Sequence, residues 1–148
     1  MKKQLKDIQV LMEAMEQEVK LTPEIPYDIE TILLRHRLIE EENNEIRDNA
    51  ILGYIARLKG DKENFFKHLV EVGDGLTDTS VVLNGCYHSY GFGQGDLAEE
   101  MFNEVQLSNM SKLGEDGKPI KREDGKFLKG ANYFRPNLVQ IIKPYMDD

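Results

Sequence analysis

The sequence contains little cysteine and no long hydrophobic run, and each shortage excludes a class of protein. Cys86 is the single cysteine among 148 residues, so an internal disulfide and a thiolate metal cluster are both excluded. No apolar run approaches the roughly 18 residues that span a bilayer, and no apolar stretch of signal-peptide length follows the two N-terminal lysines. We therefore expect a cytoplasmic protein with no membrane partner, in which Cys86 is a small core residue.

Positive charge is also scarce, except near the C-terminus. The net charge is −8, with 19 Lys and Arg against 27 Asp and Glu, which argues against a nucleic-acid partner. Residues 111–135 carry seven bases and four acids, a balance of +3, whereas the rest of the chain carries 12 bases and 23 acids, a balance of −11. The composition, 40% hydrophobic and 31% charged, is typical of one globular domain with an acidic body and a basic tail.

Hydrophobic periodicity predicts four helices joined by short connections. Apolar residues recur at helical spacing over residues 3–20, 29–58, 62–90 and 97–110. Asp28, Asp61 and Asp96 stand just before the last three of these segments, where an N-cap is expected. The layout is typical of an antiparallel bundle, so we expect an all-α fold with a four-helix core over about residues 1–110.

The last forty residues follow a different pattern. The pair Asp124-Gly125 lies between "PIKRE" and "KFLK", an arrangement that predicts a β-hairpin. A short helix is expected at about residues 138–145. We therefore expect a single domain over residues 1–148 whose basic tail covers residues 111–148.

Two clusters of carboxylates lie on consecutive predicted helices. The first, in "RLIEEENNEI", contains Glu41, Glu42 and Glu45, and the second, in "EVGDGLTD", contains Glu71, Asp74 and Asp78. Spacings of three and four residues place each set on one face of its helix, and antiparallel packing would bring the two faces together. Like charges so close are unfavourable unless a cation neutralises them, and oxygen ligands alone favour Mg²⁺, or Mn²⁺ as a substitute. A solvated acidic face is the alternative interpretation.

Two glycines, Gly73 and Gly75, lie within the second cluster. A glycine inside a helix costs about 1 kcal/mol relative to alanine. Their presence beside the acids indicates the close approach of another helix or of a ligand.

The acidic spacing resembles that of the all-α nucleoside triphosphate pyrophosphohydrolases, which include MazG, the dimeric dUTPases, the dCTP pyrophosphatases and phosphoribosyl-ATP pyrophosphohydrolase. Their motif is Glu-x-x-Glu followed, after a variable gap, by Glu-x-x-Asp. Here Glu42 and Glu45 are followed, after 25 residues, by Glu71 and Asp74. The tail "FNEVQLSNMSKLGEDGKPIKREDGKFLKGANYF" is similar to the end of the Cof-like MazG subgroup of phages and bacteria.

The resemblance leaves two registers open for the second acidic pair. In many relatives the motif aspartate stands at a set distance before the glycine that ends the helix, and counting back from Gly91 gives Asp78. In that register Gly75 occupies the position of the glutamate, and the pair becomes Asp74 and Asp78. The missing glutamate keeps an alternative open, in which the chain is a catalytically silent binding or regulatory module with a relict site.

The resemblance implies hydrolysis of a nucleoside triphosphate to the monophosphate and pyrophosphate, with a deoxynucleotide such as dUTP or dCTP as the first candidate. Two or more Mg²⁺ ions, or Mn²⁺, would be held by Glu42, Glu45, Glu71, Asp74 and Asp78, and Glu41 would accept the proton of the attacking water. The substrate-binding candidates are Arg35, Asn109, Lys112, Lys118, Lys126, Lys129 and Tyr133. Relatives are dimers or tetramers, so a second copy of the chain is the expected partner.

Overall fold

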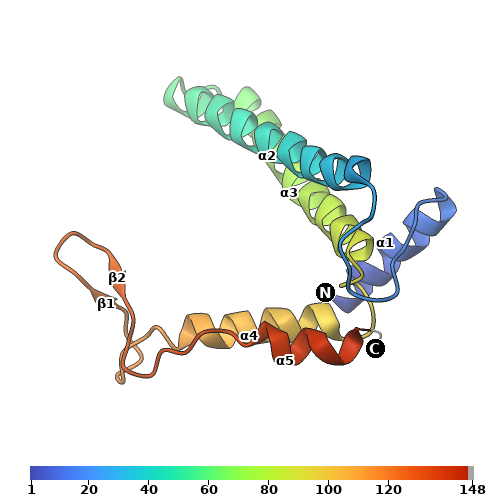
Figure 1. The fold of residues 1–148 in the computed structure, drawn as a ribbon. Helices are drawn as coiled ribbons and strands as arrows, with labels where there is room; N and C mark the ends of the chain where they lie inside the picture. The colour runs from blue at the N-terminus through green and yellow to red at the C-terminus, as the bar shows by residue number, and fades with distance from the viewer. Residues whose placement is uncertain (147–148) are drawn as a thin grey trace. The chain divides into compact units, whose positions relative to one another are not determined.

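The computed structural model describes residues 1–146, and most of them are helical (Figure 1), which confirms the all-α expectation. The elements are α1 (Lys2–Ala14), α2 (Ile29–Leu58), α3 (Lys62–Ser89), α4 (Leu97–Met110), β1 (Ile120–Lys121), β2 (Phe127–Leu128), α5 (Leu138–Ile142) and the 3-10 turn η1 (Lys143–Tyr145). The chain forms two compact units, one of residues 2–93 and one that begins at residue 94. No helix in residues 1–146 has the length and apolar character needed to cross a membrane.

The predicted caps explain why α2 and α3 begin where the sequence indicated. The Thr31 N–H donates to Asp28 Oδ1 over 2.6 Å, and the Asn64 N–H donates to Asp61 Oδ1 over 3.1 Å. Each bond satisfies a backbone donor that the first turn leaves without an intrahelical partner. The predicted bounds of α2 and α4 are confirmed, and α3 ends one residue earlier than expected.

The prediction for the first helix was wrong at its C-terminal end, because α1 stops at Ala14 and not near residue 20. Glu16 adopts a positive φ of 56°. The Gln17 N–H donates to the Met12 carbonyl and the Glu16 N–H donates to the Glu13 carbonyl, over 2.8 and 3.1 Å. This pair of bonds is a Schellman motif, which ends the helix although a glutamate holds the position that glycine usually takes.

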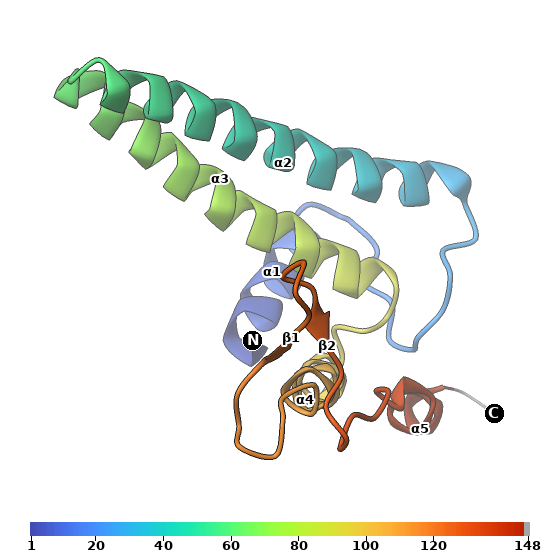
Figure 2. The same ribbon diagram turned by 90° about the vertical axis from the view of Figure 1, so that its left-hand side faces the viewer.

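Helices α2 and α3 form an antiparallel pair that lies closest near its turn, and the two ribbons spread apart toward the N-terminal end of α2 (Figures 1 and 2). Gly75 lies against Ile46, and seven residues further along both helices Gly53 lies against His68. The equal steps show that one register holds over these two turns. Packing of glycine against a side chain lets the two helices approach closely at both points.

Helix α1 packs on the C-terminal half of α3. The His88 ring donates from Nε2 to the Leu5 carbonyl over 2.8 Å, and the His88 carbonyl accepts from the Lys20 N–H over 3.0 Å. Gly91, with φ of 72°, lies directly under the Thr22 carbonyl, where a Cβ would be 1.9 Å from the oxygen. The segment after α1 therefore packs against the C-terminal end of α3 and is hydrogen-bonded to it.

The unit that begins at residue 94 contains α4, α5 and the predicted hairpin. Helix α4 packs against α5. Strands β1 and β2 pair in antiparallel fashion with Ile120 opposite Leu128, and Gly125 in their turn has a φ of 84°, which confirms the hairpin expected from Asp124-Gly125. The C-terminal helix begins at Leu138 as expected but becomes a 3-10 turn from Lys143.

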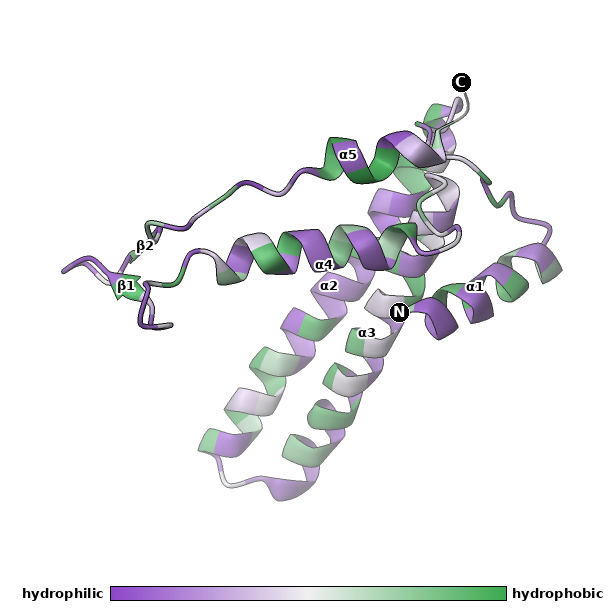
Figure 3. Cartoon of the chain, turned by 90° about the horizontal axis from the view of Figure 1, so that it is seen from below, coloured by the Kyte–Doolittle hydropathy of each residue, from purple (hydrophilic) through white to green (hydrophobic). Residues whose placement is uncertain are grey.

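Buried apolar side chains are few within residues 1–146. In residues 2–93 they are Leu5, Met12 and Ala56, with Pro23 and Pro26 in the segment after α1. Large apolar side chains at the turn between α2 and α3 stay exposed, among them Tyr54, Leu58 and Phe66 at 62%, 69% and 66%. Figure 3 shows hydrophobic residues on both helices near that turn. A helix pair with apolar residues on its outer side leaves a surface that another protein surface can cover.

Candidate functional site

The two carboxylate clusters meet where the middle of α2 crosses the middle of α3. Glu42 is half-buried there. Burial raises the pKa of the Glu42 carboxyl above its ordinary value, and the neighbouring carboxylates raise this pKa further; in decreasing order they are Glu45, Asp78, Glu41 and Asp74. Two of these neighbours belong to α2 and two to α3. The antiparallel pairing therefore gathers four acids from the two helices around the Glu42 side chain, five acids in all.

The register of α2 on α3 separates Glu71 from this group. Four residues beyond the Gly75–Ile46 contact, the two helices bring Glu71 level with Ala50, one turn past the acids around Glu42. Glu71 is not among the four carboxylates that contribute most to raising the Glu42 pKa. The geometry therefore favours the pair Asp74 and Asp78 over the pair Glu71 and Asp74.

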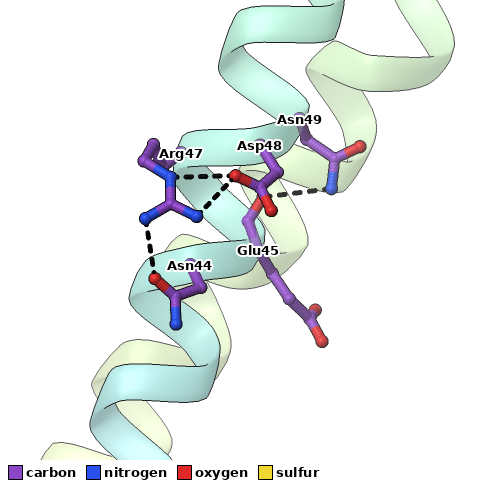
Figure 4. A network of polar contacts seen from close by, with 5 residues as sticks. All are labelled: Asn44, Glu45, Arg47, Asp48 and Asn49. Carbon is purple, nitrogen blue, oxygen red and sulfur yellow. Dashed lines mark hydrogen bonds and ion pairs between the residues drawn. The ribbon is translucent and has the colours of Figure 1, made fainter.

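The nearest basic residue on α2 does not neutralise the cluster. Arg47 donates to Asp48 Oδ1 over 2.7 and 2.8 Å and to Asn44 Oδ1 over 2.9 Å. Figure 4 shows the Glu45 carboxylate pointing away from this network, which touches Glu45 only where Asn49 donates to its main-chain carbonyl. Within residues 1–146, no hydrogen bond or ion pair joins any of the five clustered carboxylates to a base. Their mutual repulsion is therefore uncompensated by the described part of the chain.

The donor set suits a hard divalent cation. All five groups are carboxylates, the ligand type that Mg²⁺ and Mn²⁺ prefer, and a cation would relieve the repulsion that raises the Glu42 pKa. As the side chains stand, no three acidic, histidine or cysteine groups within residues 1–146 converge tightly enough to hold one ion. The residues fit the predicted metal by their chemistry, and the metal assignment stays a prediction.

Gly75 explains how the helices come so close at the cluster. A Cβ at position 75 would lie 2.8 Å from Ile46 Cγ1 and 3.8 Å from the Glu42 carbonyl, whereas a Cβ at Gly73 would meet nothing within 4 Å. Of the two glycines beside the acids, therefore, Gly75 is the one that allows the close contact between α2 and α3. In the register of Asp74 and Asp78, the absent glutamate is replaced by a residue that lets α2 pack directly onto α3.

A cavity of about 440 Å³ lies between α1 and α3, and none of the clustered carboxylates lines it. Thr77, the neighbour of Asp78, lines it together with Ser80 and Asn84 of α3 and with Gln4 and Asp7 of α1. Asn84 is only 6% exposed and donates from Nδ2 to the Ser80 carbonyl over 2.8 Å and to the Ser80 Oγ over 3.5 Å, so its Oδ1 is left for another partner. No spacing pattern could predict the cavity residues of α1, because their place in the lining depends on how α1 packs.

Four of the predicted substrate-binding residues gather at the C-terminal end of α4. Lys112 Nζ donates to Asn109 Oδ1 over 2.7 Å, and Lys129 Nζ lies 4.0 Å from the centre of the Tyr133 ring. The Gly130 N–H donates to the Lys112 carbonyl over 2.9 Å and so joins the two pairs. Lys118 and Lys126 are exposed residues at either end of the hairpin.

Arg35, also predicted to bind substrate, lies away from the carboxylates. It precedes Glu42 by seven residues, which is two helical turns or about 10.5 Å along the axis. Its side chain is buried against Ser89 and Gln17. The Arg35 guanidinium therefore lies in a different environment from the carboxylate cluster.

Comparison with known proteins adds no assignment. No protein-family model matches the chain, and no curated protein matches it either. The likeness to the all-α pyrophosphohydrolases rests on the acidic motif and on the tail, and it stays a prediction.

Proposed function

We propose that the protein is a Mg²⁺-dependent nucleoside triphosphate pyrophosphohydrolase that converts a deoxynucleoside triphosphate and water to the monophosphate and pyrophosphate. One observation carries the proposal. Glu42 is surrounded by four further carboxylates from α2 and α3, and no base in the described chain is paired with them. An uncompensated oxygen cluster of this kind is suited to divalent cations and, through them, to a polyphosphate.

Each acid has a separate part in the proposed reaction. Glu42, Glu45, Asp74 and Asp78 would hold the ions, with Glu71 in an outer supporting position. When bound, Mg²⁺ supplies the positive charge that a triphosphate needs to approach carboxylates. Glu41, which is exposed beside the cluster, would accept a proton as the water oxygen bonds to phosphorus. The α–β anhydride bond breaks, and its electron pair leaves with pyrophosphate.

The cavity between α1 and α3 is the proposed place for the nucleoside. Its volume of about 440 Å³ lies in the usual range for small-molecule sites, roughly 300–1,000 Å³. Asn84 offers its Oδ1 as an acceptor, since its N–H groups bond Ser80, and the Asp7 carboxylate also only accepts. An acceptor favours the amino group of cytosine over the carbonyl of uracil, so this lining supports dCTP ahead of dUTP.

The basic residues of the second unit would bind the leaving pyrophosphate. Lys112, Lys118, Lys126 and Lys129 are exposed, and cations at the leaving group stabilise the charge that develops there. Asn109 and Tyr133 would contact the sugar or base.

Self-association is part of the proposal. Exposed apolar side chains on α2 and α3 near their turn, including Tyr54, Leu58 and Phe66, would be covered by a second copy in a dimer or a dimer of dimers. Sedimentation velocity should give a mass of two or four times the 17.0 kDa of one chain. The double variant Leu58→Glu/Phe66→Glu should sediment as a monomer, and a wild-type monomer at high concentration would contradict the proposal.

The decisive experiment measures pyrophosphate release from a panel of nucleoside triphosphates with Mg²⁺ and then with Mn²⁺. We expect turnover with dCTP first, and loss of turnover in Glu45→Ala. Glu40→Gln, an exposed neutralising change in the same run of acids, is the matched control and should keep its activity. If no nucleotide is turned over with either metal, the enzyme proposal fails and the silent binding module takes its place.

A further inference from the structure

A buried cation without an anionic partner lies near the N-terminal end of α2. Arg35 is 9% exposed. Its Nε–H donates to Ser89 Oγ over 2.7 Å, and its Nη2 donates to Gln17 Oε1 over 3.2 Å. Both acceptors are neutral, and no ion pair involves Arg35 within residues 1–146. Burial lowers the pKa of the guanidinium, as expected when a charge is removed from water without a counter-charge.

The guanidinium keeps donors that the described chain does not use. An arginine carries five N–H donors, and the two bonds to Ser89 and Gln17 occupy one on Nε and one on Nη2. Among side-chain atoms sealed from solvent in residues 1–146, only His88 Nδ1 lacks a partner. The remaining Nη donors of Arg35 are therefore not sealed off, although Gly85 lies against Nη1.

These donors border a small cavity of about 180 Å³. Gln17, Thr31, Arg35 and Ser89 line it, so its walls come from the segment after α1, from α2 and from the end of α3. Lys20 and Glu18 line it too, and Lys20 Nζ lies 2.7 Å from both Glu18 and Glu24. The lysine is thus paired with two carboxylates, whereas Arg35 has no carboxylate partner within residues 1–146.

We propose that this cavity binds one phosphate group, held by the free Nη donors of Arg35 and by the side-chain amide of Gln17. Arginine recognises phosphate through paired N–H bonds, which suits the fork that remains. The cavity has room for about six water molecules at roughly 30 Å³ each, which is enough for a phosphate group and too little for a whole nucleotide. The ligand is therefore free phosphate or the phosphoryl end of a molecule that lies mostly outside.

The phosphate site is distinct from the carboxylate cluster. Arg35 and Glu42 are about 10.5 Å apart along α2, and no divalent cation is needed where the guanidinium itself would contact the phosphate. Binding can therefore be measured with EDTA present and without turnover, so the result does not depend on the proposed pyrophosphohydrolase activity.

Titration calorimetry with inorganic phosphate, in EDTA and at constant ionic strength set with chloride, tests the proposal on the whole chain. Wild type, Glu45→Ala and the exposed control Arg37→Gln should bind alike, within twofold. Arg35→Gln should bind at least tenfold more weakly. Equal phosphate binding by folded Arg35→Gln would overturn the proposal. So would the absence of binding to wild type at about 10 mM phosphate, at both 4 °C and 25 °C.

A second measurement keeps the test valid if Arg35→Gln does not fold. In wild-type protein labelled with ¹⁵N-arginine, phosphate should shift the Nε and Nη signals of one buried arginine, and Thr31→Val should weaken that response. Unmoved signals would refute the site. A matching response to dCMP would identify the phosphoryl end of a nucleotide as the ligand, and a response to phosphate alone would identify the free ion.

Discussion

The acidic cluster on α2 and α3 and the basic segment of residues 111–135 carry opposite charges and satisfy them differently. In the basic segment the cations find partners close by in the chain: Arg122 pairs with Asp124, Lys129 lies over Tyr133, and Lys121 lies over Phe127. Around Glu42, the carboxylates have only one another. Much of the positive charge of the basic segment is thus paired within the segment. The repulsion among the clustered carboxylates has no such partner in the described chain and would need a bound cation to relieve it.

This difference explains why the cluster is the stronger candidate for a site. Uncompensated like charges lower the stability of the folded protein unless a ligand binds them. Proteins often keep such destabilising groups at sites that bind a ligand. Cations that already have local partners carry no such demand. The following experiments change one side of the comparison at a time.

The largest effect is expected from separating the two registers of the second acidic pair. Asp78→Ala should lower kcat/KM for pyrophosphate release by roughly 100-fold or more, because it removes a carboxylate that faces Glu42. Glu71→Ala should cost about tenfold or less, since Glu71 lies one turn away. Steady-state kinetics measures both, and a reversed order would return the site to Glu71 and Asp74.

The close helix contact at the cluster offers a matched pair of glycine variants. Gly75→Ala should lower the free energy of unfolding by about 1–3 kcal/mol, because its Cβ would lie 2.8 Å from Ile46 Cγ1. Gly73→Ala, in open space, should raise it by up to about 1 kcal/mol. Urea denaturation measures both, and an equally stable Gly75→Ala would show that α2 can move away from α3 without loss.

The repulsion itself should appear as a pH dependence of the metal-free protein. The pKa of Glu42 is raised in the folded state above its ordinary value of 4.5, so the folded protein holds this proton more tightly than the unfolded chain. The associated stability is present at low pH and is lost as the pH rises through the folded pKa.

Glu42→Gln cannot lose that proton, so its stability should fall less than that of wild type between pH 5 and pH 7. At pH 7 without metal, the variant should melt a few degrees above wild type, roughly 1–3 °C, in a calorimetric scan. Added Mn²⁺ should raise the melting temperature of wild type more than that of the variant. Parallel pH curves for the two proteins would mean that Glu42 does not feel its neighbours.

The smallest effect is expected in the basic segment. Arg122→Ala removes an exposed ion pair with Asp124, and such pairs contribute little because water screens them. The melting temperature should stay within about 1 °C of wild type. A larger drop would show that the hairpin depends on this pair and that the segment is less self-sufficient than the contacts suggest.

Much of the local structure could be predicted because its causes lie within a few residues. The caps of α2 and α3 act between residues three apart, and the hairpin follows from Asp124-Gly125. The end of α1 could not be predicted in this way. Val19 continues the apolar spacing, yet Glu16 takes a left-handed conformation, which residue preferences alone argue against.

The candidate site was predictable in composition but not in arrangement. Helical spacing places Glu42 with Glu45, and Asp74 with Asp78, on single faces. It does not say which acids meet across the two helices, because that depends on the register set where Gly75 packs on Ile46. Nor does it reveal the cavity beside Asn84, whose other wall is α1.

The sequence by itself determined the helices, the hairpin and two faces of carboxylates, since these follow from hydrogen bonds and periodicity over a few residues. Only the tertiary structure decided that Asp78 faces Glu42, that Glu71 lies a turn away, and that Arg35 is buried beside Ser89, 54 residues further along the chain. The physical reason is that burial and charge environment are properties of contacts between distant segments. A pattern within one helix does not contain them.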